Sequence, residues 1–312
     1  MANFLELVEI RTKLASLLPL VIGVLFAVVY FGQIDKLNTL LFAVATLLVD
    51  MATTAINNLM DYHKARSQRY LQETNIISKA GLAPRKVAAM IVAMLFVASI
   101  LGLVLVWRTQ WILLLIGGAC FVIGIFYTFG PLPLSRLPLG EVFSGVTMGL
   151  GIPFIAVFVN VQGSHFLTVQ WAWPQLYVSG NWVALVALGL VCVTPMATIA
   201  NVMLANNLSD LDEDIANHRT TLPMYLGLQH ALGLYAGLAY CGLLALVMAV
   251  VLGLMRWPLL VAFVALPGVV RNTRRFMAKQ VKAETFPTAI ANLVLANGAL
   301  IVGLLIDWRW PA

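Results

Sequence analysis

The sequence predicts an all-α integral membrane protein, a bundle of about nine transmembrane helices formed by two parallel pseudo-repeats. Of its 312 residues, 61% are hydrophobic and only 10% are charged, which is far from the usage of soluble proteins. Apolar runs close to the roughly 20 residues that cross a bilayer as a helix recur along the whole chain. The segment Asn-Asn-Leu-x-Asp occurs twice, at 57–61 and at 206–210, and each copy closes an apolar run. This repetition indicates two related halves.

Nine apolar runs account for the expected spans. They are 14–31, 39–60, 87–107, 111–129, 140–160, 183–206, 229–253, 257–271 and 287–307. The eighth run is short and is interrupted by Pro267 and Gly268, so eight spans is the alternative. We expect residues 1–312 to form one membrane domain, with halves near 1–135 and 136–312.

The basic residues predict how the chain crosses the membrane. With the N-terminus inside, the cytoplasmic loops contain 15 of the 19 Lys and Arg residues, and positive charge is retained on the cytoplasmic side of membrane proteins. Both repeated segments then lie at the cytoplasmic ends of the second and sixth spans. Four spans separate them, an even number, so the halves are parallel rather than inverted. We expect a multi-pass protein of the cell membrane.

The repeated segments contain the candidate metal ligands. If the helix continues past the sixth span, Asn206, Asp210 and Asp214 are each four residues apart and share one face. Asn57 and Asp61 repeat that spacing on the second span. Closely packed carboxylates repel one another unless a cation lies between them, and carboxylate and amide oxygens suit Mg²⁺. The pattern therefore predicts a Mg²⁺ site at the cytoplasmic mouth.

Other charged residues near these segments have simpler interpretations. Asp212 points away from the shared face, and we expect it and Glu213 to be solvated. The same side of the membrane is rich in Lys and Arg, and carboxylates opposite such cations indicate a metal-bridged anion, most simply a diphosphate. Lys279 and Lys282 have no motif near them, so we assign them to membrane topology alone.

Asp50 lies two turns deeper in the second span than Asn57. A carboxylate at that depth is a functional group, a group held by a hydrogen bond to a neighbouring helix, for instance through Thr53 or Thr54, or a protonated acid, and these alternatives stay open. For four lone amides inside spans, hydrogen bonding between helices is the expected role; these are Asn160, Asn201, Asn292 and Asn297.

Several motifs together resemble one enzyme family. The stretch 206–214, followed by 217–222, resembles the second aspartate-rich motif of UbiA-superfamily prenyltransferases. Its Asn-Asn start is most similar to the 1,4-dihydroxy-2-naphthoate polyprenyltransferase branch. Residues 127–131 and 138–141 resemble that branch at the connection between the fourth and fifth helices, and 11–13 resemble the family's first helix.

The resemblance implies a bundle around a central cavity, in which a polyprenyl diphosphate binds with its head at the cytoplasmic mouth. Mg²⁺ and basic groups would stabilise the departing diphosphate, and an aromatic acid would attack the allylic cation. The implied metal ligands are Asp61, Asp210, Asp214, Asn57 and Asn206, and the three acids together with Tyr127 are the implied catalytic groups. The substrate-binding residues would be Arg11, Arg69, Lys79, Arg219 and Glu141, together with the two amides.

Two departures from the family pattern affect this interpretation. The first motif usually reads Asn-Asp-x-x-Asp, and here Asn58 replaces the first Asp, so that site offers one acid. In the second motif, His218 and Arg219 stand where Gly-Lys is usual, and Arg binds phosphate with a different geometry from Lys.

The function implied is Mg²⁺-dependent prenylation of 1,4-dihydroxy-2-naphthoate with loss of CO₂, which gives a demethylmenaquinone. A related prenyltransferase that uses 4-hydroxybenzoate is the alternative, and a cation transporter is the alternative from another class, in which Asp50 would be the ion site. The expected partners are the lipid bilayer, the prenyl diphosphate and the aromatic acid, with no nucleic acid.

Overall fold

The computed structural model describes residues 2–64, 75–130, 133–161, 166–216 and 220–310, and these fold into a helical bundle. The helices and strands of the first half are α1 (Ala2–Leu7), η1 (Ile10–Lys13), α2 (Leu14–Phe31), α3 (Lys36–Lys64), α5 (Ile76–Lys79), α6 (Pro84–Arg108), α7 (Ile112–Phe126) and η2 (Leu134–Arg136). Those that follow are α8 (Gly140–Ser144), η3 (Gly145–Gly151), α9 (Ile152–Asn160), β1 (Leu167–Ala172), β2 (Gln175–Gly180), α10 (Trp182–Ser209), α11 (Leu211–Ala216), α12 (Leu222–Leu226), α13 (Leu228–Val251), η5 (Trp257–Ala265), α14 (Leu266–Ala278) and α15 (Phe286–Arg309).

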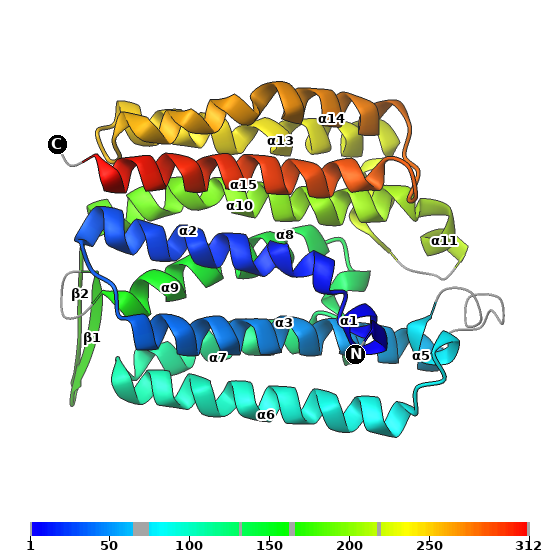
Figure 1. Ribbon diagram of the computed structural model, residues 1–312, viewed down its shortest axis with the longest axis horizontal. Coiled ribbons are helices and arrows are strands. Elements are labelled where there is room, and N and C mark those ends of the chain that lie inside the picture. The colour runs from blue at the N-terminus through cyan, green and yellow to red at the C-terminus, as the bar shows by residue number, and fades with distance from the viewer. Residues whose placement is uncertain (1, 65–74, 131–132, 162–165, 217–219, 311–312) are drawn as a thin grey trace.

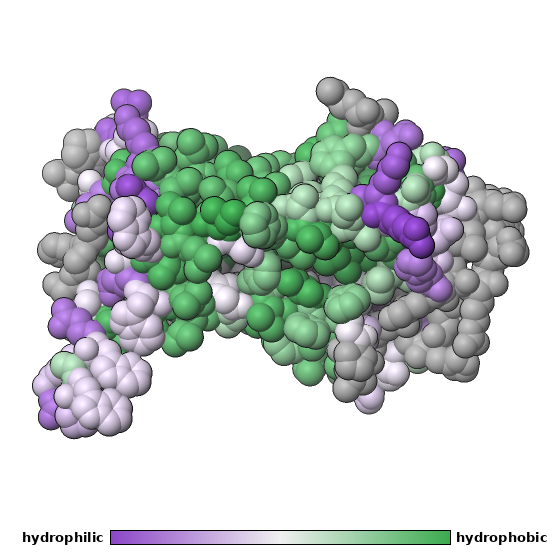
Figure 2. All heavy atoms as spheres, turned by 90° about the horizontal axis from the view of Figure 1, so that it is seen from below, coloured by the Kyte–Doolittle hydropathy of each residue, from purple (hydrophilic) through white to green (hydrophobic). Residues whose placement is uncertain are grey.

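The long helices lie roughly side by side and define two ends of the molecule (Figure 1). The short helices α1, α5 and α11 lie at one end, which we call the motif end because α3 and α10 bring both repeated segments there. The β1–β2 hairpin and the C-terminus lie at the opposite, far end. The face in Figure 2 is apolar in its middle, between two more polar ends, as a bilayer-spanning protein requires.

The expected spans are largely confirmed. Seven helices among the described residues are long and apolar enough to cross a membrane, and Ile112–Phe126 is a shorter apolar helix. The expected span 140–160 is made of α8, the π-helical segment η3 and α9 in succession. In the region 257–271, the 3₁₀ segment η5 leads directly into α14, and Pro267 lies in the first turn of α14, where a missing N–H costs nothing. The total of nine spans stays a prediction.

The hairpin of β1 and β2 was not predicted from the sequence. The two strands pair antiparallel, with Leu167 opposite Gly180 and Ala172 opposite Gln175. Trp111 at the start of α7 donates its indole N–H to Val169 O at 3.0 Å, which fixes the hairpin to the bundle. Within β1, Leu167, Val169 and Trp171 alternate with Thr168 and Gln170, which is the period of a strand, whereas β2 contains three successive apolar or aromatic residues at 176–178.

Close helix packing places α10 at the centre of the second half. It packs against α13, α15 and η3, while α3 packs against α6, and α2 against α9 and α15. Gly149 of η3 is required there, because a Cβ atom would lie 2.4 Å from the backbone of Met196. The expected interhelical hydrogen bonds of the four lone amides are confirmed; their partners are Asp35 and Thr39 for Asn160, Tyr235 for Asn201, Thr273 for Asn292 and Thr198 for Asn297.

Candidate active site

The second repeated segment keeps its helical spacing across the end of α10. Helix α10 ends at Ser209, and α11 begins at Leu211. The N–H of Asp210 nevertheless donates to Asn206 O at 3.0 Å, and the N–H of Asp214 donates to Asp210 O at 2.8 Å. Asn206, Asp210 and Asp214 are therefore linked at four-residue intervals, as the sequence predicted for a continuing helix.

Lys282 contacts the two side chains of this segment that face the motif end. Its ammonium donates to Asn206 Oδ1 and to Asp210 Oδ2, and it lies 5.1 Å from the centre of the Phe286 ring. The assignment of Lys282 to membrane topology alone was wrong, because the segment joining α14 to α15 folds back onto the motif. Lys282 lies more than 70 positions from Asp210 in the sequence, so the sequence pattern could not predict this contact. Lys279 instead pairs with Glu284 at 2.9 Å on the surface.

The other acids of the segment differ in exposure. Asp212 is exposed, as its position on the helix predicted, and Asp214 is buried. Within the described ranges, no group of three or more His, Cys, Asp or Glu side chains is arranged to hold a metal ion. The three-acid ligand set of Asp61, Asp210 and Asp214 therefore stays a prediction.

The first repeated segment lies on the last turns of α3. Asn57 is exposed and Asp61 is half-buried, one helical turn apart on the same face. Asn58 donates its amide N–H to Leu7 O at 2.9 Å, and its backbone carbonyl accepts from the Asn75 side chain at 3.0 Å. The amide that replaces the family's aspartate thus joins α1 to α3, while the backbone of the same residue joins the start of α5 to α3.

Glu9 lies between α1 and η1 and forms a hydrogen bond with Asn58 of the first segment. It occupies the left-handed backbone region at φ +48°, which is unusual for a residue with a side chain. Desolvation by neighbouring protein atoms raises the pKa of the Glu9 carboxyl above its ordinary value, while Lys13, a hydrogen bond with Asn58, and Lys282 act in the opposite direction. The charge of Lys282 therefore acts on Glu9 together with Lys13 and Asn58.

Glu141 contacts the second segment, and Tyr127 contacts Gly140, the residue before Glu141. Asn207 donates its side-chain N–H to Glu141 Oε1 at 2.8 Å, and both residues are buried. Glu141 Oε2 has no hydrogen-bond partner among the residues that the structure describes. The Tyr127 hydroxyl donates to Gly140 O at 3.4 Å, so the end of α7 is held against the start of α8.

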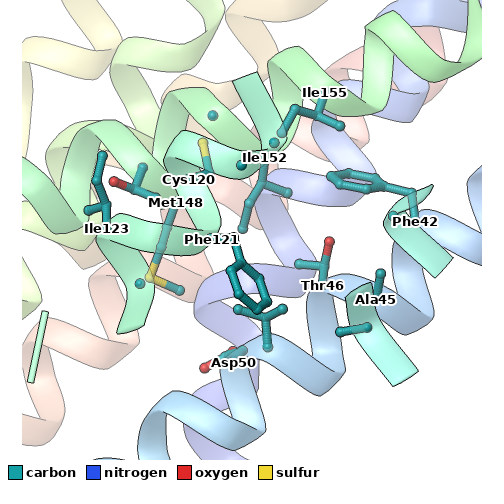
Figure 3. A pocket seen from close by; sticks show the side chains of 18 of the residues that line it. Phe42, Ala45, Thr46, Asp50, Cys120, Phe121, Ile123, Met148, Ile152 and Ile155 are labelled. Atoms are coloured by element: carbon teal, nitrogen blue, oxygen red, sulfur yellow. The ribbon is translucent and has the colours of Figure 1, made fainter. Parts of the chain in front are cut away.

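An apolar cavity of about 420 Å³ lies between α3, α6, α7 and the η3–α9 segment (Figure 3). Tyr127 and Ser144 line it near the motif end, and Phe42, Leu113 and Ile155 line it toward the far end. Its volume falls within the roughly 300–1,000 Å³ of ordinary small-molecule sites. The shape and the apolar lining suit a hydrocarbon chain that runs along the bundle.

A buried ion pair lies in the wall of this cavity. The Lys13 ammonium is 2.6 Å from Asp50 Oδ1 and donates to Thr54 Oγ1 at 2.6 Å, while Ser16 Oγ donates to Asp50 Oδ2 at 2.6 Å. Asp50 is therefore held by Lys13 of η1 and Ser16 of α2. Hydrogen bonding to a neighbouring helix was one of its predicted roles, although the example given was a threonine of α3 rather than Lys13.

The remaining predicted diphosphate contacts are four basic residues, of which Lys79 is described in full. Lys79 is exposed, and its ammonium is 3.8 Å from the Glu6 carboxylate of α1. Arg69, Arg219 and the side chain of Arg11 lie outside the described residues. Their contacts with a diphosphate stay predictions.

Comparison with known proteins decides the family. Residues 16–297 match the sequence profile of the UbiA prenyltransferase family. The chain belongs to this family. A Bacillus subtilis protein named 1,4-dihydroxy-2-naphthoate octaprenyltransferase is 25% identical over 308 residues, which cover 97% of this chain and 92% of that protein. A Natronomonas pharaonis digeranylgeranylglyceryl phosphate synthase is 28% identical over 271 residues, covering 84% and 87% respectively.

The fold is also that of a solved family member. The structure of a UbiA homolog from Archaeoglobus fulgidus bound to GPP and Mg²⁺ superposes with a TM-score of 0.67 at 14% identity, covering 99% of this chain and 100% of the other. This protein is accordingly an integral membrane prenyltransferase with a helical bundle fold. The cation-transporter alternative is set aside, since the chain is an enzyme and Lys13 already neutralises Asp50.

Proposed function

We propose that this prenyltransferase transfers a polyprenyl group from polyprenyl diphosphate to 1,4-dihydroxy-2-naphthoate with loss of CO₂, in a Mg²⁺-dependent reaction. The observation that supports it most directly is the convergence of Asn206 Oδ1 and Asp210 Oδ2 on one cation, the Lys282 ammonium, at the motif end. The cavity that begins beside Tyr127 provides the apolar space for the tail. A cation site for the head and a dry space for the tail are the two requirements of a prenyl diphosphate.

The residues at the second segment fit Mg²⁺, because they offer one carboxylate and one amide oxygen to a shared positive centre. Asp214, Asn57 and Asp61 would complete the ligands. When bound, the metal would neutralise charge that develops on the departing diphosphate. Lys282 would then exchange its contact with Asp210 for a contact with a diphosphate oxygen. This new contact would strengthen as negative charge grows on the departing diphosphate.

Further diphosphate contacts come from basic residues of the same end. We propose Arg11, Arg69, Lys79 and Arg219 for this role, on the basis of the family resemblance and the charge of these loops. Lys79 would have to leave its exposed pairing with Glu6, which is cheap because exposed ion pairs contribute about 0–1 kcal/mol. The excess of Lys and Arg in the loops of the motif end supports a cytoplasmic position for it.

The cavity wall protects the allylic cation that remains when the diphosphate leaves. Water would capture such a cation, and the apolar side chains from Phe42 to Ile155 exclude it from the tail. The Tyr127 ring, at the motif end of the cavity, offers its electron-rich face to positive charge. These side chains would thus protect the allylic cation from water until the aromatic ring carbon attacks it.

The acceptor assignment relies on the Bacillus subtilis relative, which aligns over nearly the whole chain. We propose that the flat acid enters at the motif end and meets Tyr127, at the start of the cavity, together with Glu141 and the loop that carries Lys79. Its carboxylate should not be clamped by a bidentate Arg, because such a clamp stabilises the ground state and opposes release of CO₂. The product would be a prenylated naphthoquinol, the reduced form of demethylmenaquinone.

A panel assay tests this function. Purified protein receives Mg²⁺, a polyprenyl diphosphate and, in separate reactions, 1,4-dihydroxy-2-naphthoate or 4-hydroxybenzoate, and products are identified by mass. We expect prenylation of the naphthoate with loss of the mass of CO₂ and little turnover of the benzoate. A clear preference for the benzoate, or full activity in excess EDTA, would contradict the proposal.

A further inference from the structure

The cavity wall contains one acid among the described residues that line it, Asp50. Figure 3 shows its carboxyl at the edge of the pocket, on the same helix as Thr46, with Phe121 and Met148 from other elements around the same space. Its side chain is 14% exposed, whereas that of its partner Lys13 is 3% exposed. The carboxylate therefore faces the cavity, and the ammonium lies behind it.

The contacts of Asp50 leave capacity for a ligand. Oδ1 accepts from Lys13 and Oδ2 accepts from Ser16, one donor for each oxygen. A carboxylate can accept about four hydrogen bonds, so lone pairs remain on the cavity side. Lys13 has no such freedom, since its donors already reach Asp50 Oδ1, Asp50 O and Thr54 Oγ1.

Stability alone gives a poor reason for this pair. Burying two charges costs several kcal/mol each before they attract one another, and apolar side chains of similar size are often as stable or more so. Within a membrane span the cost is retained where a polar group meets a substrate or an ion. Lys13 already neutralises the charge of Asp50. The ligand that suits the free lone pairs of Asp50 is therefore an uncharged hydrogen-bond donor.

The depth of Asp50 suits the reacting end of the substrates. It lies seven residues before Asn57 on α3, which is roughly 10 Å at the rise of an α-helix. A diphosphate bound at the motif end would place its first carbons along these two turns, between Asn57 and the apolar part of the cavity. The aromatic acceptor must lie beside those carbons.

We infer that Asp50 is a catalytic base that accepts the proton of the acceptor's ring hydroxyl, a role that rests on the proposed function. Lys13 and Ser16 are positioning residues that fix the carboxylate. As the O–H proton moves to Asp50, its electron pair forms the C=O bond of a ring ketone. The ring's π pair forms the new bond to the allylic carbon, and the diphosphate leaves with the electrons of its C–O bond.

The same carboxyl then returns the proton. Attack at the carbon bearing the carboxylate gives a β-keto acid, whose C–CO₂ bond breaks to release CO₂. The electron pair of that bond restores the aromatic ring as an enolate, and the enolate oxygen takes the proton back from Asp50. The step consumes no oxidant or reductant, and Asp50 ends in the form in which it began.

The test is a double-change cycle that combines the Asp50→Asn variant with a modified acceptor. In that acceptor, the hydroxyl next to the carbon that is prenylated is methylated. It uses whichever acid of the panel the parent enzyme prenylates, so failure of the naphthoate assignment does not affect it. We expect Asp50→Asn to lower kcat by about 10²–10⁴-fold, the usual contribution of a positioned base. KM for the prenyl diphosphate and acceptor-free diphosphate release should stay within threefold. With the parent enzyme, methylation of the acceptor should lower kcat by a similar factor. With the methylated acceptor, Asp50→Asn should lower kcat little further.

Two further variants keep the test decisive if the unpaired Lys13 prevents folding. The charge-neutral Lys13→Met, Asp50→Asn double variant should show the same loss of kcat, and Ser16→Ala should lower kcat about tenfold without unpairing a charge. Asp35→Asn, which breaks the 3.2 Å ion pair with Arg108 at the far end, is the matched control and should retain kcat. A folded Asp50 variant with kcat within threefold of the parent, additive losses with the methylated acceptor, or a parent that prenylates no hydroxyl-bearing acid would overturn the inference.

Discussion

The two copies of the repeated segment share four of five residues, yet their first amide and their acid have different surroundings. In the second copy, Asn206 and Asp210 both contact Lys282. In the first copy, the equivalent Asn57 is exposed and Asp61 is half-buried. In the second half a lysine from a distant segment therefore contacts both side chains of the motif, whereas in the first half the amide is open to solvent.

The second amide of each copy teaches a different lesson. Asn58 donates to Leu7 O, and Asn207 donates to the Glu141 carboxylate. Both side chains thus join the motif helix to a neighbouring segment. The replacement of the family's aspartate by Asn58 is explained by this contact, because a carboxylate has no N–H to donate to a carbonyl.

The largest expected effect is at Asp210. Asp210→Ala should lower kcat about 10³-fold, because it removes an oxygen on which the cation site depends and leaves Lys282 unpaired. Asp212→Ala, on the exposed neighbour, should retain activity within threefold. The measurement is steady-state prenylation at saturating Mg²⁺. Equal losses of kcat in the two variants would show that Asp210 and the exposed Asp212 do not differ in role.

Asp61→Ala sharpens the comparison between the halves. We expect a loss of about 10²-fold and a rise in the Mg²⁺ concentration needed for half-maximal rate, because its first-half site has one acid rather than several. A Mg²⁺ titration of both variants checks this result. If Asp61→Ala behaves like Asp212→Ala, the first segment does not contribute to the metal site.

Lys282→Gln tests whether the contact in the second half serves the substrate. We expect KM for the prenyl diphosphate to rise about tenfold, since a charge-assisted hydrogen bond contributes about 1.5–3 kcal/mol, while KM for the aromatic acid changes little. Lys279→Gln is the matched control, because Lys279 pairs only with the exposed Glu284 among the contacts found for it. An equal rise in both variants would indicate a nonspecific effect of loop charge.

The smallest effects concern the second amides. Asn207→Ala should cost about 1–3 kcal/mol of unfolding free energy by leaving a buried Glu141 oxygen unpaired, and Asn58→Ala about 0.5–1.5 kcal/mol. Thermal unfolding in detergent measures both losses. Activity per folded molecule should change little in Asn58→Ala, and a loss as large as that of Asp61→Ala would show that Asn58 acts in the site itself.

Composition and the lengths of the apolar runs predicted the membrane bundle, because bilayer thickness sets the length of a spanning helix. The face shared by Asn206, Asp210 and Asp214 was also predictable, since the helical hydrogen bonds continue past Ser209. Local patterns could not predict that Lys282 contacts Asp210 or that Lys13 neutralises Asp50, because these contacts join segments distant in sequence. The hairpin after α9 was missed although β1 alternates apolar and polar residues, because β2 has three successive apolar or aromatic residues at 176–178 and no alternation.

The most direct test of the account follows the acceptor's carboxyl carbon. The enzyme receives Mg²⁺, a polyprenyl diphosphate and carboxyl-labelled 1,4-dihydroxy-2-naphthoate, and released CO₂, diphosphate and prenylated product are quantified together. We predict equal amounts of labelled CO₂ and diphosphate, an unlabelled prenylated product, and no reaction in excess EDTA. Label retained in the prenylated product would contradict the account and assign this protein to another branch of its family.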